Sequence, residues 1–173
     1  MLTKTDLATP TLIEGWLRDI AFTPIQRPDP NNNWNVEFVL SGPTPLSLRV
    51  VNTKALPRAI TVVCGMATAP EHAAMFTKLP ENARKEFWQQ LRASLNREFV
   101  EFQIQGAAFA ECPTLVQLTA TRYDDGLTLD SFARTVASVI KAAFDVMFFY
   151  HERLGEVGAP AGGEFAFKKL DVQ

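Results

Sequence analysis

Three stretches of the chain, at residues 34–40, 46–52 and 59–66, alternate apolar and other side chains with a period of two. Successive side chains of a β-strand point to opposite faces, so this period predicts three half-buried strands. Short segments rich in turn residues separate the stretches, which favours an antiparallel meander with one covered face. The inward residues are predicted to be Trp34, Val36, Phe38, Leu40, Leu46, Leu48, Val50, Ile60, Val62, Cys64 and Met66.

The segment before the first strand, RPDPNNNWNVEF, resembles a metal-binding loop. Asp29, Asn31 and Asn33 alternate as the first three ligands of a calcium-binding hand would. Such a loop also needs Gly at its sixth position and Glu at its twelfth, where this chain has Trp34 and Leu40. The segment is therefore predicted to be a turn, in which Asp and Asn side chains bond the nearby backbone.

Helical spacing dominates the rest of the chain. Apolar residues recur at helical intervals in residues 10–21, where Pro10 follows Thr9 at a helix start. A helical region begins at Pro70 and either continues or starts again after Pro80. The longest helix is predicted between a capping Thr128 and a closing Gly155. Two more alternating stretches, at residues 100–105 and 114–123, predict two further strands.

This order of elements predicts an α+β fold. Its simplest form is a five-stranded antiparallel sheet with helices packed on one face, in the order α-βββ-α-ββ-α. We expect a single domain over residues 1–155, followed by a Gly/Pro-rich tail over residues 156–173. The tail carries Phe165 and Phe167 in a segment, EFAFKK, that alternates as a strand would.

Length and charge exclude several classes of protein. A chain of 173 residues suits one domain. Its formal net charge of -2 does not indicate binding to nucleic acid or to an anionic membrane, because both attract a basic surface. No apolar run approaches the ~20 residues that span a bilayer. The first ten residues, MLTKTDLATP, lack the apolar region of a signal peptide, so a cytoplasmic location is expected.

Residues that carry chemistry are scarce. His72 and His151 are the two histidines, and neither belongs to a metal-ligand pattern. No nucleotide-binding or nucleophile-elbow motif occurs, and the adjacent aspartates of the DDG segment indicate a turn. Cys64 lies in an apolar run and Cys112 in an expected loop, so two free thiols are predicted, with Cys112 the more exposed. We therefore expect no catalytic, cofactor-binding or metal-binding residues, no cofactor, and no enzymatic activity.

The segments IEGWL, NWNVEFVL, SLRVVN, EFWQQL and YDDGLTLDSFARTVASVI resemble an uncharacterised prokaryotic family with a type III secretion chaperone-like fold. The small dimeric chaperones of type III secretion share the element order predicted above. The chain departs from them in its Gly/Pro tail and around APEHAAMF. The resemblance implies a homodimer that binds protein, without implying secretion.

Two hypotheses of function follow. The first is a non-enzymatic protein-binding or chaperone-like module that forms a homodimer, with a protein client and no membrane or nucleic-acid partner. The second is a small-ligand-binding or enzymatic domain with a pocket between sheet and helices. The first rests on surplus apolar residues of the outer sheet face, the last helix and the tail. These possible partner contacts are Val39, Val51, Val63, Phe144, Phe148, Phe149, Phe165 and Phe167.

Overall fold

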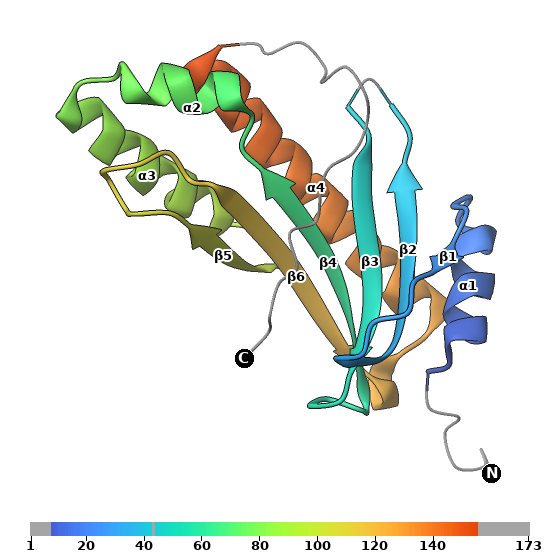
Figure 1. The fold of residues 1–173 in the computed structure, drawn as a ribbon. Coiled ribbons are helices and arrows are strands. Elements are labelled where there is room, and N and C mark those ends of the chain that lie inside the picture. Colours follow the sequence, from blue (N-terminus) through green and yellow to red (C-terminus); the bar gives the residue numbers. More distant parts are fainter. Residues whose placement is uncertain (1–7, 43, 156–173) are drawn as a thin grey trace.

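The computed structural model describes residues 8–42 and 44–155 and confirms the α+β class. A single antiparallel sheet forms the middle of the molecule, and helices lie against it (Figure 1). The elements in chain order are α1 (Pro10–Asp19), β1 (Ile25–Gln26), β2 (Asn32–Leu40), β3 (Leu46–Thr53), β4 (Ala59–Ala67), α2 (Pro70–Thr77), α3 (Glu81–Leu95), β5 (Glu101–Gln105), β6 (Leu115–Tyr123), the 3-10 turn Asp124–Gly126 and α4 (Leu129–Leu154).

The sheet has six strands in the described residues, in the order β1-β2-β3-β4-β6-β5, so the prediction of five is wrong. The additional strand, β1, is two residues long and pairs with Glu37 and Val36 of β2. Two residues cannot show a period of two, and Ile25 and Gln26 lie in a connector punctuated by proline. Only the pairing with β2 makes this segment a strand.

Most helix boundaries follow from local signals. Thr9 Oγ1 accepts a hydrogen bond from the backbone N–H of Leu12, and Pro10 begins α1. Thr128 caps α4 in a reciprocal arrangement with Ser131. Gly155, with φ of +89°, ends α4, since a positive φ strains residues that have a Cβ. The predicted helical region is two helices, because α2 ends at Thr77 and α3 begins at Glu81, with Pro80 as its N-cap.

The segment before β2 is a turn, as predicted. The Asp29 carboxylate accepts hydrogen bonds from the backbone N–H of Asn31, at 3.0 Å, and from the Asn32 side chain, at 2.9 Å. Lys54 Nζ donates to the carbonyl of Pro30 and fastens the turn to the β3–β4 connection. The turn delivers Trp34, which is half-buried and packs against the core.

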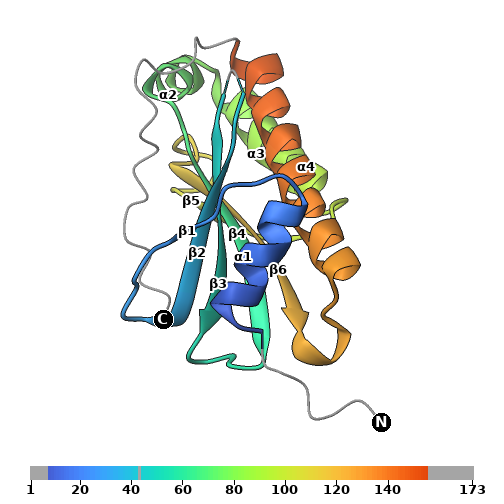
Figure 2. The ribbon, with the colours of Figure 1, turned by 90° about the vertical axis from the view of Figure 1, so that its right-hand side faces the viewer.

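One face of the sheet carries the core and the helices α1, α3 and α4 (Figure 2). α4 packs against β4 and β6, α1 packs on β2, and α3 lies beside α4. Leu48, Val62 and Leu118, from three neighbouring strands, are fully buried beneath this layer. Complete burial of each such side chain stabilises the fold by about 1.5–3 kcal/mol. No helix of residues 8–42 and 44–155 covers the opposite face, which we call the open face.

None of the described helices is both long enough and apolar enough to cross a membrane.

Candidate interaction surfaces

The strand register brings residues from five strands into one row across the open face. Glu37 of β2 lies opposite Arg49 of β3, and Arg49 lies opposite Val63 of β4. The row continues through Thr119 of β6 to Glu101 of β5. Charged residues therefore stand toward the two edges of the open face, and small β-branched residues occupy its middle.

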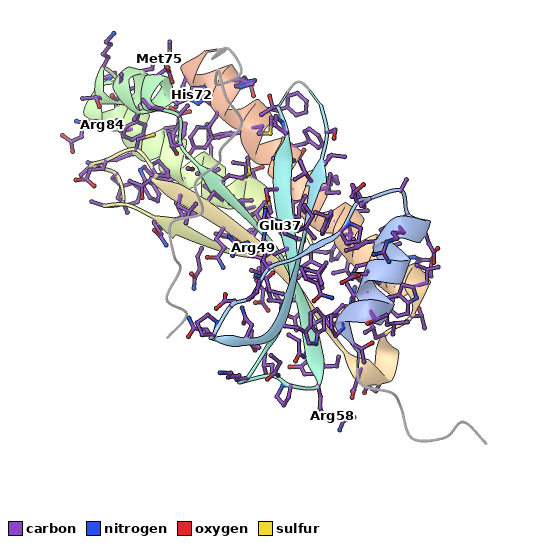
Figure 3. The ribbon with its side chains drawn as sticks, turned by 45° about the vertical axis from the view of Figure 1, so that its right-hand side comes forward. Glu37, Arg49, Arg58, His72, Met75 and Arg84 are labelled. Atoms are coloured by element: carbon purple, nitrogen blue, oxygen red, sulfur yellow. The ribbon has the colours of Figure 1, made fainter. Side chains whose placement is uncertain are left out.

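The β2 side of this row is held by polar contacts. Glu37 accepts hydrogen bonds from Arg27 Nε and from Ser47 Oγ, each at 3.0 Å. Arg49 projects from the neighbouring strand on the same face (Figure 3). These contacts fix the side chains where β1, β2 and β3 meet, so this side of the open face has a defined shape.

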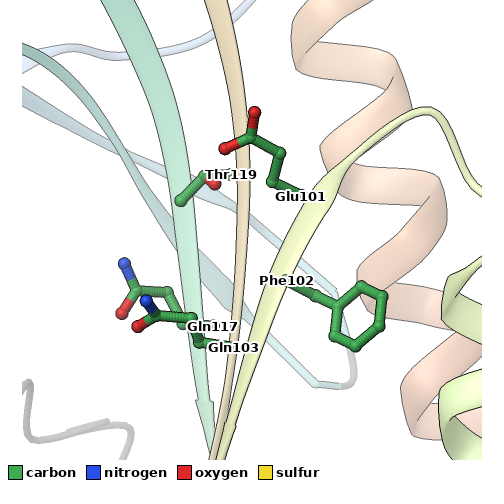
Figure 4. Close-up of a pocket in the computed structure, with 5 residues that line it drawn as sticks. All are labelled: Glu101, Phe102, Gln103, Gln117 and Thr119. Atoms are coloured by element: carbon green, nitrogen blue, oxygen red, sulfur yellow. The ribbon is translucent and has the colours of Figure 1, made fainter.

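On the same open face, a shallow hollow lies at the other edge of the sheet, over β5 and β6. Its volume is about 180 Å³, and Glu101, Phe102, Gln103, Gln117 and Thr119 line it. Gln103 lies opposite Gln117 and Glu101 opposite Thr119, so the polar groups form two cross-strand pairs (Figure 4). One carboxylate, two amides and a hydroxyl can bind hydrogen-bond donors or a cation, and the amides can also donate.

β5 forms the edge of the sheet beside this hollow. It pairs with β6 on one side, and no strand of the described chain pairs with its outer side. Phe102 and Ile104 are half-buried on the core side, whereas Glu101, Gln103 and Gln105 are exposed on the open face. An exposed strand edge presents a row of backbone N–H and C=O groups to a partner.

The three valines predicted as partner contacts all lie on the open face. Val39 is 42% exposed, whereas Val51 and Val63 are half-buried between their neighbours on adjacent strands. Val51 pairs with Thr61 and Val63 with Thr119, so the valines belong to a mixed valine and threonine surface. Val39 stands apart from the other two, near the end of β2.

The structure separates the three phenylalanines predicted on α4. Phe148 is 66% exposed, and its ring stacks on that of the half-buried Phe144 with a centroid separation of 6.3 Å. Phe149 points to another side of the helix, where its ring centroid is 4.9 Å from that of Phe87 in α3. Phe149 therefore packs between helices, and only Phe144 and Phe148 remain as surface candidates. Phe165 and Phe167 lie outside the described residues.

A buried polar cluster joins α2 and the connection before it to the end of α4. His72, only 6% exposed, lies with Nε2 at 3.0 Å from the carbonyl oxygen of Gly155. The Tyr150 hydroxyl is 3.3 Å from Thr68 Oγ1, and burial raises the pKa of Tyr150. These contacts fasten the C-terminal end of α4 to the start of α2, which is a structural role.

Both cysteines are free, as predicted, and both are buried. Cys112, which the sequence suggested could be exposed, is the more exposed of the two, but only at 9% against 0% for Cys64. Burial raises the pKa of the Cys64 thiol to about 12 and that of the Cys112 thiol to about 11. At neutral pH both are therefore protonated and poorly nucleophilic. Cys112 is buried because its loop folds back onto α3, where Trp88 Nε1 donates to the carbonyl of Glu111 at 2.9 Å.

Sequence reasoning missed two surface features. It took Glu101, Gln103 and Gln117 only as the polar residues that alternate with apolar ones in two expected strands, because such alternation gives no sign that the polar side chains converge. It also missed Phe99, which is 96% exposed just before β5. The polar–apolar alternation of residues 101–105 was the available signal, but the edge position of β5 depends on sheet order.

The sequence model of a family described as uncharacterized conserved protein, DUF2299, matches residues 10–150. The chain belongs to this family. The match extends from the start of α1 almost to the end of α4. It therefore includes both the β5 edge with its hollow and the surface phenylalanines of α4. A search of curated proteins found no match.

Solved structures of other proteins also resemble the chain. An uncharacterized protein from Methanothermobacter thermautotrophicus is 25% identical, with a TM-score of 0.76, and the alignment covers 84% of this chain and 98% of that one. YbjN from E. coli, a proposed transcription regulator, is 11% identical with a TM-score of 0.52. That alignment covers 87% of this chain and 97% of YbjN and shows a likeness of fold alone.

Proposed function

We propose that the protein is a non-catalytic module that binds an extended segment of a partner protein along β5. The observation that carries this proposal is the position of β5 at the sheet edge, with no strand of the described chain on its outer side. A partner strand added there would gain main-chain hydrogen bonds, and alternate side chains would give selectivity.

The side chains around β5 indicate which segment would fit. On the open face, the partner would meet Glu101, Gln103 and the rest of the hollow, which favours cationic or amide side chains. On the core side it would meet Phe102 and Ile104, which favours apolar side chains. The preferred segment therefore alternates lysine, arginine or glutamine with apolar residues.

Two further observations support a binding role without catalysis. The thiols have raised pKa values, and His72 is engaged with the end of α4. The resemblance to type III secretion chaperones also supports protein binding, since apart from β1 and the division of the middle helix the element order is the one they share.

The alternative, a ligand pocket between sheet and helices, has less support. Large side chains fill that space, and Trp88 and Phe132 are among those that are fully buried. The hollow over β5 and β6 lies on the open face instead.

Affinity capture from the native host, combined with hydrogen exchange, tests the proposal. Wild-type protein should retain a partner, and Q117K should retain much less, because the new cation repels lysine or arginine in the hollow. T61K is the matched control, since Thr61 lies on the same face but on β4, two strands from β5. Bound partner should also slow amide exchange in residues 101–105. Equal capture by Q117K and wild type, without added protection of β5, would contradict the proposal.

A further inference from the structure

The outward side of α4 carries a stripe of apolar residues that the described chain leaves uncovered. Ala133 and Ala137 are four residues apart, as are Phe144 and Phe148, and the two pairs are separated by two helical turns. Such spacings place all four on one side of the helix. Ala137 and Phe148 are exposed, and Ala133 and Phe144 are half-buried. We call these four residues the α4 stripe; the helix runs along the outside of the molecule (Figure 2).

The two halves of the α4 stripe differ in size. The N-terminal half has two alanines, and the C-terminal half has two stacked aromatic rings. Ala133 and Phe148 are equally distant from the midpoint between Ile140 and Lys141, and so are Ala137 and Phe144. A second copy in antiparallel orientation would therefore place each ring opposite an alanine, as close packing of helices requires.

We propose that two copies of the chain form a symmetric dimer through the α4 stripe. The helices pack antiparallel about a two-fold axis that passes between them, at the level of the midpoint between Ile140 and Lys141. The α4 stripe of each copy then contacts the α4 stripe of the other, because a two-fold interface uses the same patch on both subunits. This proposal names the surface of the expected homodimer, and it does not depend on the β5 edge.

The charges beside the α4 stripe fit the same arrangement. A two-fold axis brings identical residues together, and an unpaired lysine there would be repelled by its own copy. Lys141 Nζ is held by Glu98, at 2.7 Å, and by Asp145, at 2.9 Å, so its charge is balanced within one chain. Arg134 lies on the same flank and is balanced in the same way by Asp130 of its own chain, at 3.0 Å. It would also approach Asp145 of the second copy, a group of opposite charge.

The extent of the contact sets its strength. The α4 stripe spans 16 of the 26 residues of α4, a length of about 24 Å at the usual helical rise. A pair of helices this long buries less than the roughly 1,200–2,000 Å² of a standard interface. Ile140, Met147 and the 38% exposed Leu129 enlarge the apolar area at its rim. We expect a dimer with a dissociation constant in the micromolar range.

Sedimentation equilibrium of the full chain tests the surface. Wild type should be a dimer at tens of micromolar and dissociate on dilution, and A137E and F148E should each be monomeric under the same conditions. F99E is the matched control, because Phe99 is more exposed than Phe148 but lies before β5, outside the α4 stripe. Circular dichroism should show all three variants folded. A monomeric wild type, or stripe variants that dimerise like F99E, would overturn the proposal.

A size exchange tests the register. A133F places a ring against Phe148 of the second copy, and F148A leaves a gap there, so each should weaken association by about tenfold or more. The double variant A133F/F148A restores one ring opposite one alanine and should associate more tightly than either single variant. A double variant weaker than both would show that these positions do not face each other, and the antiparallel register would be wrong. The comparison of Q117K with T61K in partner capture does not depend on the α4 stripe. The two proposals therefore fail separately.

Discussion

Arg58 and Asp124 form a bidentate ion pair that joins the start of β4 to the turn before α4. Arg58 Nε and Nη2 lie 2.9 and 3.0 Å from the two Asp124 carboxylate oxygens. These hydrogen bonds, opposed by desolvation, lower the pKa of Asp124 from its ordinary 3.8. A carboxyl whose pKa is lower in the folded state stabilises the fold above the unfolded value, and this contribution is lost as pH falls through the folded value.

We therefore predict that D124N loses stability at neutral pH and responds less than wild type to acid below the ordinary value of 3.8. D130N should retain the wild-type acid response, because Asp130 is in an exposed pair with Arg134. Urea unfolding at a series of pH values measures both effects. Parallel pH profiles for D124N and wild type would refute the role given to this pair.

The thiols give a second prediction at this scale. Because burial raises both pKa values, Cys64 and Cys112 should react slowly with iodoacetamide in native protein at neutral pH, and Cys64 more slowly. Both should react quickly in urea. Mass spectrometry of peptides from timed samples measures the rates. Rapid native labelling of Cys112 would mean that its loop opens readily.

At the scale of elements, α4 depends on its N-terminal cap. Thr128 Oγ1 accepts from the backbone N–H of Ser131 at 3.2 Å, and Ser131 Oγ accepts from the backbone N–H of Thr128 at 2.8 Å. T128A should lower the free energy of unfolding by about 1 kcal/mol. S138A is the control: Ser138 bonds the carbonyl of Arg134 within the helix, and its loss should change stability by less than about 0.5 kcal/mol. Equal effects in urea unfolding would contradict the capping role.

At the scale of the whole molecule, the buried core is contained in a single helix-and-sheet cluster that runs from Ile13 to Leu154. We predict that a chain ending at Gly155 keeps the fold, with unchanged circular dichroism and a similar unfolding midpoint. If residues 156–173 occupy an apolar surface, as the EFAFKK pattern suggested, the truncated chain should bind more hydrophobic dye. Unfolding of the truncated chain would show that the domain does not end at residue 155.

The sequence alone determined the first and last helices, the five longer strands and their inward residues, because helical and strand periods arise from local geometry. It left open whether the middle helical region was one helix or two. It also determined the turn at Asp29 and both caps of α4, which depend on neighbours a few residues away. It separated Val51 and Val63 from the core because they alternate with buried residues in their strands.

Only the tertiary structure decided what depends on contacts distant in sequence. Ile25 and Gln26 become a strand because β2 is beside them, and Cys112 is buried because its loop meets α3. The sheet order places β5 at an edge, and the path of α4 turns Phe148 outward while Phe149 meets α3. Apolar side chains on one helix look alike in the sequence, and only the packing of the other elements decides which remain for a partner.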